Sequence, residues 1–124
     1  MICERDLTER IIAAAIEMHR NLGPGLLESV YEECLCHELH LRNLSFERQK
    51  PLPIEYKGIR FSCCYRMDIV VENKVVLELK CVDAITSIHE AQLLTYLKLS
   101  KLRIGFILNF SVPVMKNGMK RFVL

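Results

Sequence analysis

Three charged residues interrupt two apolar stretches of this sequence. Asp68 lies within Tyr-Arg-Met-Asp-Ile-Val-Val (residues 65–71), and Glu78 and Lys80 lie within Val-Val-Leu-Glu-Leu-Lys-Cys (residues 75–81). Central strands this apolar are normally covered on both faces, where an unpaired charge is costly. The sequence therefore predicts a site that compensates these charges. The alternative is a partly buried ion-pair triad at an exposed strand end.

The turn between the two stretches decides whether the three charges can meet. Glu78 and Lys80 are two residues apart and share one face of a strand. Asp68 joins them only if it pairs with Glu78, which centres the turn on Asn73 and requires an odd-length or bulged loop. A two-residue loop would place Asp68 on the other face. Asn73 tolerates a left-handed backbone, which makes the odd loop plausible.

Two carboxylates opposed across a hairpin repel each other, and a divalent cation is the usual way to neutralise that repulsion. Ligand sets made only of oxygen favour Mg²⁺ or Mn²⁺ over zinc. A lysine beside such a site can orient an attacking water or stabilise charge that develops on a phosphoryl oxygen. The three residue types together therefore suit metal-assisted chemistry at a phosphoryl group.

Two predicted helices carry further polar residues. His89, Gln92 and Tyr96 are three and four residues apart, which predicts a polar and aromatic strip opposite three leucines, Leu93, Leu94 and Leu97. An exposed helix face explains each of them equally well. Glu28, with Tyr31 at +3, lies at the margin of another apolar stripe, and its alternative role is a first-turn acid that complements the helix dipole.

The periodicity of apolar residues predicts the elements that position these side chains. Helices are expected over residues 6–22, 27–41 and 88–100, the last opened by a Ser87-x-x-Glu90 capping box. Extended pieces are expected at 45–49, 52–56, 61–71, 75–82, 103–110 and, as an edge strand, 120–124. The order α-α-β-β-β-α-β-β predicts an α/β fold with a mixed sheet flanked by helices.

Length and composition limit the organisation of the chain. Its 124 residues are 51% hydrophobic and 26% charged, with a mean hydropathy of +0.17. These values predict one globular domain over residues 1–124 and exclude a disordered chain. Apolar runs fall far short of the roughly 20 residues that span a bilayer, and the N-terminus resembles no export signal. We therefore expect a cytoplasmic protein without membrane contact.

Six cysteines raise the question of disulfides or a metal, but no Cys-x-x-Cys spacing occurs. Cys34 and Cys36 would diverge on a helix, and the adjacent Cys63 and Cys64 would point to opposite faces of a strand. Reduced thiols that serve as small core residues are the expectation. A thiol-based metal or redox protein is the weaker alternative.

Charge is distributed unevenly although the net charge is only +2. The first 40 residues hold eight acids and three bases, whereas the last 34 hold no acid. This C-terminal segment would suit a phosphate backbone if its six cations form one face. Solvated side chains explain the bias equally well. The cations are Lys98, Lys101, Arg103, Lys116, Lys120 and Arg121.

Four ordered motifs together resemble one small bacterial and archaeal family, the GxxExxY proteins, which are grouped with the PD-(D/E)XK nuclease superfamily. The resemblance covers nearly the whole chain and implies an αβββαβ restriction-endonuclease-like core with an extra N-terminal helix. The motifs are Gly25-Leu-Leu-Glu28-Ser-Val-Tyr31, Asp68, Glu78-x-Lys80 and Gln92-x-x-x-Tyr96.

The resemblance also implies roles for the acidic residues. Asp68 and Glu78 would be the central metal ligands, and Glu28 on the first core helix would be the outer acid of the metal site. Met67 stands where the name of the superfamily has proline, a position that varies widely among its members.

The resulting hypothesis is a nuclease that hydrolyses phosphodiester bonds, of DNA rather than RNA, with Mg²⁺ or Mn²⁺ as cofactor. Lys80 would be the water-positioning or charge-stabilising base, with Gln92 and Tyr96 as the fourth-motif pair. The alternative is a non-catalytic module that keeps the nuclease fold and binds nucleic acid or another partner. A homodimer is left open, because short chains without an added binding domain often dimerise.

Overall fold

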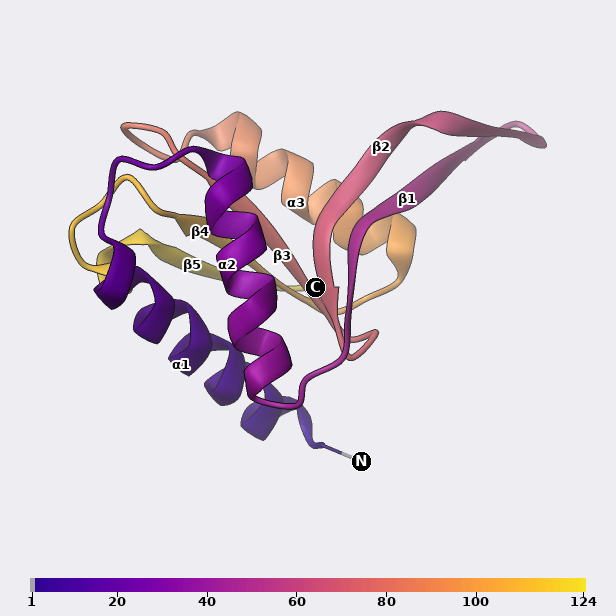
Figure 1. The fold of residues 1–124 in the computed structure, drawn as a ribbon. Helices are drawn as coiled ribbons and strands as arrows, with labels where there is room; N and C mark the ends of the chain where they lie inside the picture. The colour runs from indigo at the N-terminus through magenta and orange to yellow at the C-terminus, as the bar shows by residue number, and fades with distance from the viewer. Residues whose placement is uncertain (1) are drawn as a thin grey trace.

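The computed structural model describes residues 2–124, apart from the side chains of Cys63 and Cys64. Over these residues it contains three α-helices, five strands and one short 3-10 helix before the last strand (Figure 1). Their bounds are α1 Glu4–Leu22, α2 Glu28–Leu41, β1 Phe46–Tyr56, β2 Ile59–Val71, β3 Val75–Lys80, α3 Ser87–Ser100, β4 Ile104–Asn109 and β5 Met119–Val123.

The strands form one mixed sheet in the order β1-β2-β3-β4-β5. β3 and β4 are parallel and are connected through α3, while the other neighbours are antiparallel. This confirms the predicted α/β class, the mixed sheet and the αβββαβ order that follows α1. The pieces predicted at 45–49 and 52–56 are one continuous strand, β1. Pro51 and Pro53 are tolerated inside it because β1 is an edge strand.

Helices cover both faces of the sheet (Figure 1). On one face, α1 and α2 pack against alternate residues of the central strands, such as Leu77 and Phe106. On the other face, α3 packs through Leu93, Tyr96 and Leu97 against the intervening residues. α3 lies close to β4, since a Cβ added at Gly105 would be 2.9 Å from Leu93 Cδ1.

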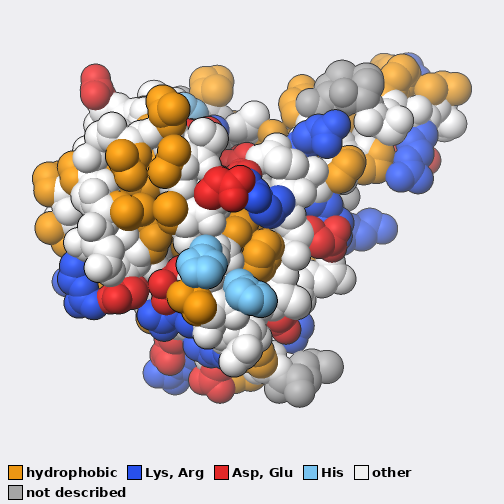
Figure 2. All heavy atoms as spheres, in the orientation of Figure 1, with side chains coloured by type: hydrophobic (Ala, Val, Ile, Leu, Met, Phe, Trp, Pro, Cys, Tyr) orange, Lys and Arg blue, Asp and Glu red, His pale blue; other side chains and the backbone are white. Residues whose placement is uncertain are grey.

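The β1–β2 hairpin extends well beyond the sheet. We call its outer part, residues 51–66, the arm (Figure 1). Lys57 and Gly58 at its tip have φ values of 48° and 83°. Positive φ at both central residues is typical of the tight turn whose twist matches antiparallel strands. Figure 2 shows the arm standing clear of the body of the molecule.

The start of α3 differs from the predicted capping box. The N-cap residue is Thr86, whose backbone N–H donates to His89 Nδ1 at 3.0 Å. Glu90 instead pairs with Lys120. The predicted polar strip is also wrong in part, because Tyr96 is buried in the same cluster as Leu93 and does not lie opposite it. His89, three residues after the N-cap Thr86, therefore takes the role that was predicted for Glu90. The predicted Ser87-x-x-Glu90 box was one residue out of register.

The six C-terminal cations do not form one face. Lys120 and Arg121 are consecutive on β5 and therefore point to opposite faces, toward α3 and toward α1 respectively. Lys116 lies beside Ile16 of α1, and Arg103 is 3.9 Å from Glu4. The predicted phosphate-binding surface required all six cations on one face, and the structure does not place them so.

The cysteines follow the core-thiol expectation only in part. Cys36 is buried, Cys34 and Cys81 are half-buried and Cys3 is exposed, and these four are free. The expectation for Cys63 and Cys64 lies outside the described side chains. Among residues 2–124, no helix is both long and apolar enough to cross a membrane.

Candidate active site

The β2–β3 hairpin has the register that brings Asp68 opposite Glu78. Ile69 pairs with Leu77 and Val71 with Val75, which leaves the three-residue loop 72–74. Asn73 in this loop has a φ of 54°. The predicted odd-length loop and the predicted register are therefore confirmed.

Asp68 and Glu78 exchange hydrogen bonds with each other's strands. Glu78 Oε2 accepts a bond of 2.9 Å from the Asp68 N–H, and Asp68 Oδ2 accepts one of 2.9 Å from the Leu79 N–H. The regular β2–β3 ladder ends one residue earlier, at Ile69 and Leu77. Carboxylates thus replace carbonyl groups where the two strands separate, which orients both side chains.

Burial disfavours the charged form of both acids. Glu78 is only 4% exposed, and burial, followed by the charge of Asp68, raises its pKa to about 8. Burial also raises the pKa of Asp68, against the opposing effect of the Leu79 N–H bond. A pair of acids held together in this way is a place where a cation would restore full ionisation.

Lys80 lies near all three predicted metal-site acids. Its positive charge opposes the rise in the pKa of Glu28, Asp68 and Glu78. Asn109, its neighbour on β4, fixes the end of this strand: Asn109 Nδ2 donates to the Val82 carbonyl at 2.9 Å. The Val82 N–H donates in return to Asn109 Oδ1 at 3.2 Å. The sequence analysis did not identify Asn109, because a single asparagine within an apolar stretch does not indicate that its side chain will bond to the backbone of Val82.

Glu28 is the first residue of α2 and faces the same region from the other layer. Burial and then the charge of Asp68 raise its pKa, and Lys80 lowers it. Among the described side chains, however, no three of His, Cys, Asp or Glu form a group that could hold a metal ion. The hydrogen bonds join Asp68 with Glu78, and Glu28 does not complete such a group with them.

Tyr31 explains why a glycine and a tyrosine flank Glu28 in the motif. Its hydroxyl donates to the Gly23 carbonyl at 2.5 Å and accepts from the Leu26 N–H at 3.1 Å. Its ring is fully buried and stacks on Phe110, with centroids 4.6 Å apart. Tyr31 thereby ties down the loop that leads into Glu28, a loop in which Gly25 has a φ of 108°.

Gln49 and Glu32 join the site from its other side. Gln49 lies across from Asp68 on β1, has a φ of 50°, and interrupts the pairing between Arg48 and Lys50. Its Nε2 is 2.8 Å from Glu32 Oε1 and 3.5 Å from Asp68 Oδ1. Glu32 could have been suspected, since it lies one turn after Glu28. No sequence signal marks Gln49.

Tyr96 approaches the carboxylates from α3, and Gln92 lies one turn earlier on the same helix. Burial, followed by the charges of Glu78 and Asp68, raises the pKa of Tyr96 to about 12. Gln92 lines a groove on α3 together with Tyr96 and Tyr65. Among the described residues, no hydrogen bond joins Gln92 to Asp68 or Glu78.

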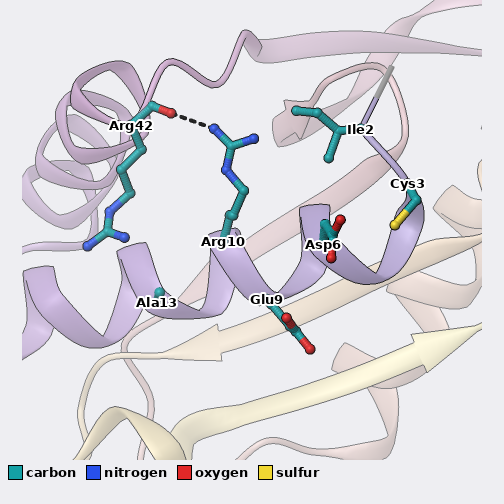
Figure 3. Close-up of a pocket in the computed structure, with 7 residues that line it drawn as sticks. All are labelled: Ile2, Cys3, Asp6, Glu9, Arg10, Ala13 and Arg42. Atoms are coloured by element: carbon teal, nitrogen blue, oxygen red, sulfur yellow. Dashed lines mark hydrogen bonds between the residues drawn. The ribbon is translucent and has the colours of Figure 1, made fainter.

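A hollow of about 610 Å³ lies away from these residues, between α1 and the C-terminal end of α2 (Figure 3). Its acids are exposed and its arginines are half-buried, and Arg10 Nη2 donates to the Arg42 carbonyl at 2.7 Å. It contains none of the predicted site residues. We therefore place the candidate site at the separating ends of β2 and β3, between α2 and α3.

A protein-family comparison agrees with this arrangement. A family model described as the PD-(D/E)XK nuclease superfamily matches residues 5–122. This match supports a nuclease-type function in general; such nucleases generally use divalent metals and act on nucleic acids. No significant match was found among curated proteins or among solved structures. The chain belongs to the PD-(D/E)XK nuclease superfamily.

Proposed function

We propose that this protein is a nuclease that hydrolyses phosphodiester bonds in DNA with the help of Mg²⁺ or Mn²⁺. The observation that carries the proposal is the reciprocal bonding of Asp68 and Glu78 at the end of the β2–β3 ladder, with Lys80 beside them. Buried acids with raised pKa values next to a lysine are typical of functional sites.

The donors fit a hard cation. Asp68 and Glu78 offer only oxygen, and backbone N–H groups already orient one oxygen of each. Asp68 and Glu78 would hold the metal, and Glu28 would be the outer acid of the site. When bound, such an ion supplies Lewis acidity and lowers the pKa of a coordinated water.

The remaining site residues would act on the substrate. Lys80 would stabilise negative charge that develops on a phosphoryl oxygen. The pKa of Tyr96, raised to about 12, keeps its hydroxyl protonated near neutral pH, so that it can donate a hydrogen bond. Gln92, on α3 like Tyr96, would contact the substrate from the same helix. We also place the chain within the GxxExxY group, because Tyr31 gives that motif a structural purpose here.

A binding module that keeps the nuclease fold without cleaving is the second candidate. It is favoured by the same two hydrogen bonds, because they partly satisfy the buried acids without any metal. In that case Lys80 is one member of a structural ion cluster.

A cleavage assay separates the two candidates. We expect purified protein to cut plasmid or oligonucleotide DNA with Mg²⁺ or Mn²⁺ and not with EDTA. Lys80→Ala should lower the rate about 10²-fold or more while DNA affinity stays within a few-fold, because Lys80 acts on charge present mainly in the transition state. Lys116→Ala, on the α1 side, is the matched control and should retain the rate. Binding without cleavage of any single- or double-stranded DNA or RNA would support the module instead.

A further inference from the structure

The arm has one apolar face that its own chain leaves uncovered. Tyr56 pairs with Ile59, and Ile54 pairs with Phe61. Residues directly opposite in an antiparallel pair share a face, so these four side chains form one stripe. The stripe continues from Leu52 and Met67, which α3 buries at the base of the arm. Beyond α3 it is open, with Tyr56 62%, Ile59 58% and Phe61 49% exposed.

A groove runs beside the stripe, between the base of the arm and the outer side of α3. Its volume is about 320 Å³. Ile54 and Tyr65 form one wall. Ile88 and Leu99 of α3 lie at its two ends and are 74% and 37% exposed. The groove is therefore apolar and opens on the same side as the stripe.

The residues of the arm indicate which kind of molecule could bind to its apolar face. Three of the arm's charged residues lie on the opposite face, where Glu55 pairs with Arg60 and Arg66 with Pro51. The fourth, Lys57 at the tip, places its Nζ 5.3 Å from the centroid of the Tyr56 ring. A nucleic acid would meet few cations on the apolar face. Pro51 and Pro53 lack the N–H groups that an added strand would use along the edge. The occupant that fits is an apolar protein surface packed face to face.

A second copy of the chain supplies such a surface at the right size. The stripe from Ile59 to Tyr65 is about 20 Å long at the rise of a strand, and α3 from Ile88 to Leu99 is about 17 Å long at the rise of a helix. Three partly exposed aromatic side chains, of about 150–250 Å² each when fully exposed, together with three partly exposed aliphatic ones, offer on the order of 600 Å² per copy. A stable dimer buries about 800 Å² per partner once its polar rim is included. The six are Tyr56, Ile59, Phe61, Tyr65, Ile88 and Leu99.

We propose that two copies form a two-fold dimer in which the tip of each arm lies in the arm–α3 groove of the other copy. Such an interface is self-complementary, as two-fold symmetry requires. The arm tip would fill the groove lined by Gln92 and Tyr96, so in the dimer the side of α3 assigned above to substrate is closed, and substrate must bind the monomer or enter from another side of the carboxylates. The proposal does not depend on the proposed nuclease activity.

Sedimentation equilibrium from about 1 to 100 µM tests the proposal with two neighbouring variants. Phe61→Glu places a charge on the apolar face, and Arg60→Glu places the same side chain on the preceding residue, which pairs with Glu55 on the opposite face. Both residues are exposed, so both variants should keep the circular dichroism and melting temperature of the free chain. We expect wild type and Arg60→Glu to be dimers and Phe61→Glu to be monomeric, with Kd raised at least 100-fold.

A photo-crosslinker at Ile59 identifies the surface that receives the arm. The expected crosslink joins Ile59 of one copy to the α3 segment 88–99 of another, and it should disappear on dilution below Kd. A wild-type monomer at 100 µM would overturn the proposal, as would equal dissociation of both variants or crosslinks only between two arms. A monomeric wild type whose duplex DNA binding is weakened by Phe61→Glu would also overturn it, since the apolar face of the arm would then contact nucleic acid.

Discussion

The bonding of Asp68 and Glu78 makes each residue depend on the other's strand. Each carboxylate accepts from a backbone N–H that would otherwise face a gap in the ladder. Removing one acid therefore leaves a buried donor unsatisfied, as well as removing a ligand. This double role is why amide variants, which keep an acceptor oxygen, are the better probes of metal binding.

Metal binding should stabilise the protein through Asp68. At ten times its Kd, Mg²⁺ or Mn²⁺ adds about 1.4 kcal/mol to the free energy of unfolding, which corresponds to a rise in Tm of roughly 3–8 °C. Asp68→Asn should show much less of this rise, and Asp83→Asn, at an exposed acid, should show all of it. Differential scanning fluorimetry measures both. Equal shifts in Asp68→Asn and wild type would contradict coordination at this site.

The metal-free protein should lose stability as the pH rises. Glu78 has an ordinary pKa of 4.5 and a folded-state pKa of about 8. Between these values the folded chain binds more protons than the unfolded chain, so the free energy of unfolding falls with increasing pH. The stabilising contribution is complete below pH 4.5 and is lost above about pH 8.

Urea denaturation in EDTA from pH 5 to pH 9 measures this slope. Glu78→Gln should flatten most of it, since glutamine does not titrate, and Asp68 contributes the remainder in the same direction. Glu55→Gln in the arm is the control. An unchanged slope in Glu78→Gln would assign the pH dependence to other groups.

At the scale of elements, the register of the β2–β3 hairpin was predictable from the sequence. The approach of Gln49 on β1 to Asp68, from the other side of β2, was not. Alternation within residues 65–71 and 75–81, together with Asn73, favoured the pairing of Asp68 with Glu78, because only an odd-length loop placed all three charges on one face, and the structure confirms that register. Gln49 reaches Asp68 from a strand whose pairing is set by contacts distant in sequence. The residues around Gln49 in the sequence do not predict its positive φ of 50°.

Helix α2 depends on Tyr31 for its starting position. Tyr31→Phe keeps the ring on Phe110 but removes the bonds to Gly23 and Leu26. The loss of a buried hydrogen-bonding group should cost about 1–3 kcal/mol, and Mn²⁺ affinity should fall several-fold as Glu28 becomes less well placed. Chemical denaturation and calorimetric titration measure the two effects. Tyr56→Phe, at an exposed position, is the control. Lost stability with unchanged affinity would remove Glu28 from the metal site.

At the scale of the whole molecule, predictions from the sequence failed where they depended on which elements lie side by side. Six cations in the last 34 residues suggested one basic surface, yet β5 alternates them between the two faces. The extended pieces predicted at 52–56 and 61–71 gave no indication of an arm, because alternation shows that a face is apolar and not whether the chain covers it. Both features depend on contacts between elements, whereas the order of helices and strands was predicted correctly.

The single parallel pairing in the sheet has a consequence for the order in which the site forms. β1, β2 and β3 are joined by short turns, and Ile69 meets Leu77 only eight residues later. β3 meets β4 across a longer span, since Val75 pairs with Ile104 and the intervening chain must first form α3. Local contacts form faster than distant ones. Asp68 and Glu78 should therefore come together early in folding, while still hydrated, and lose their water only when α3 docks and brings Tyr96 against them.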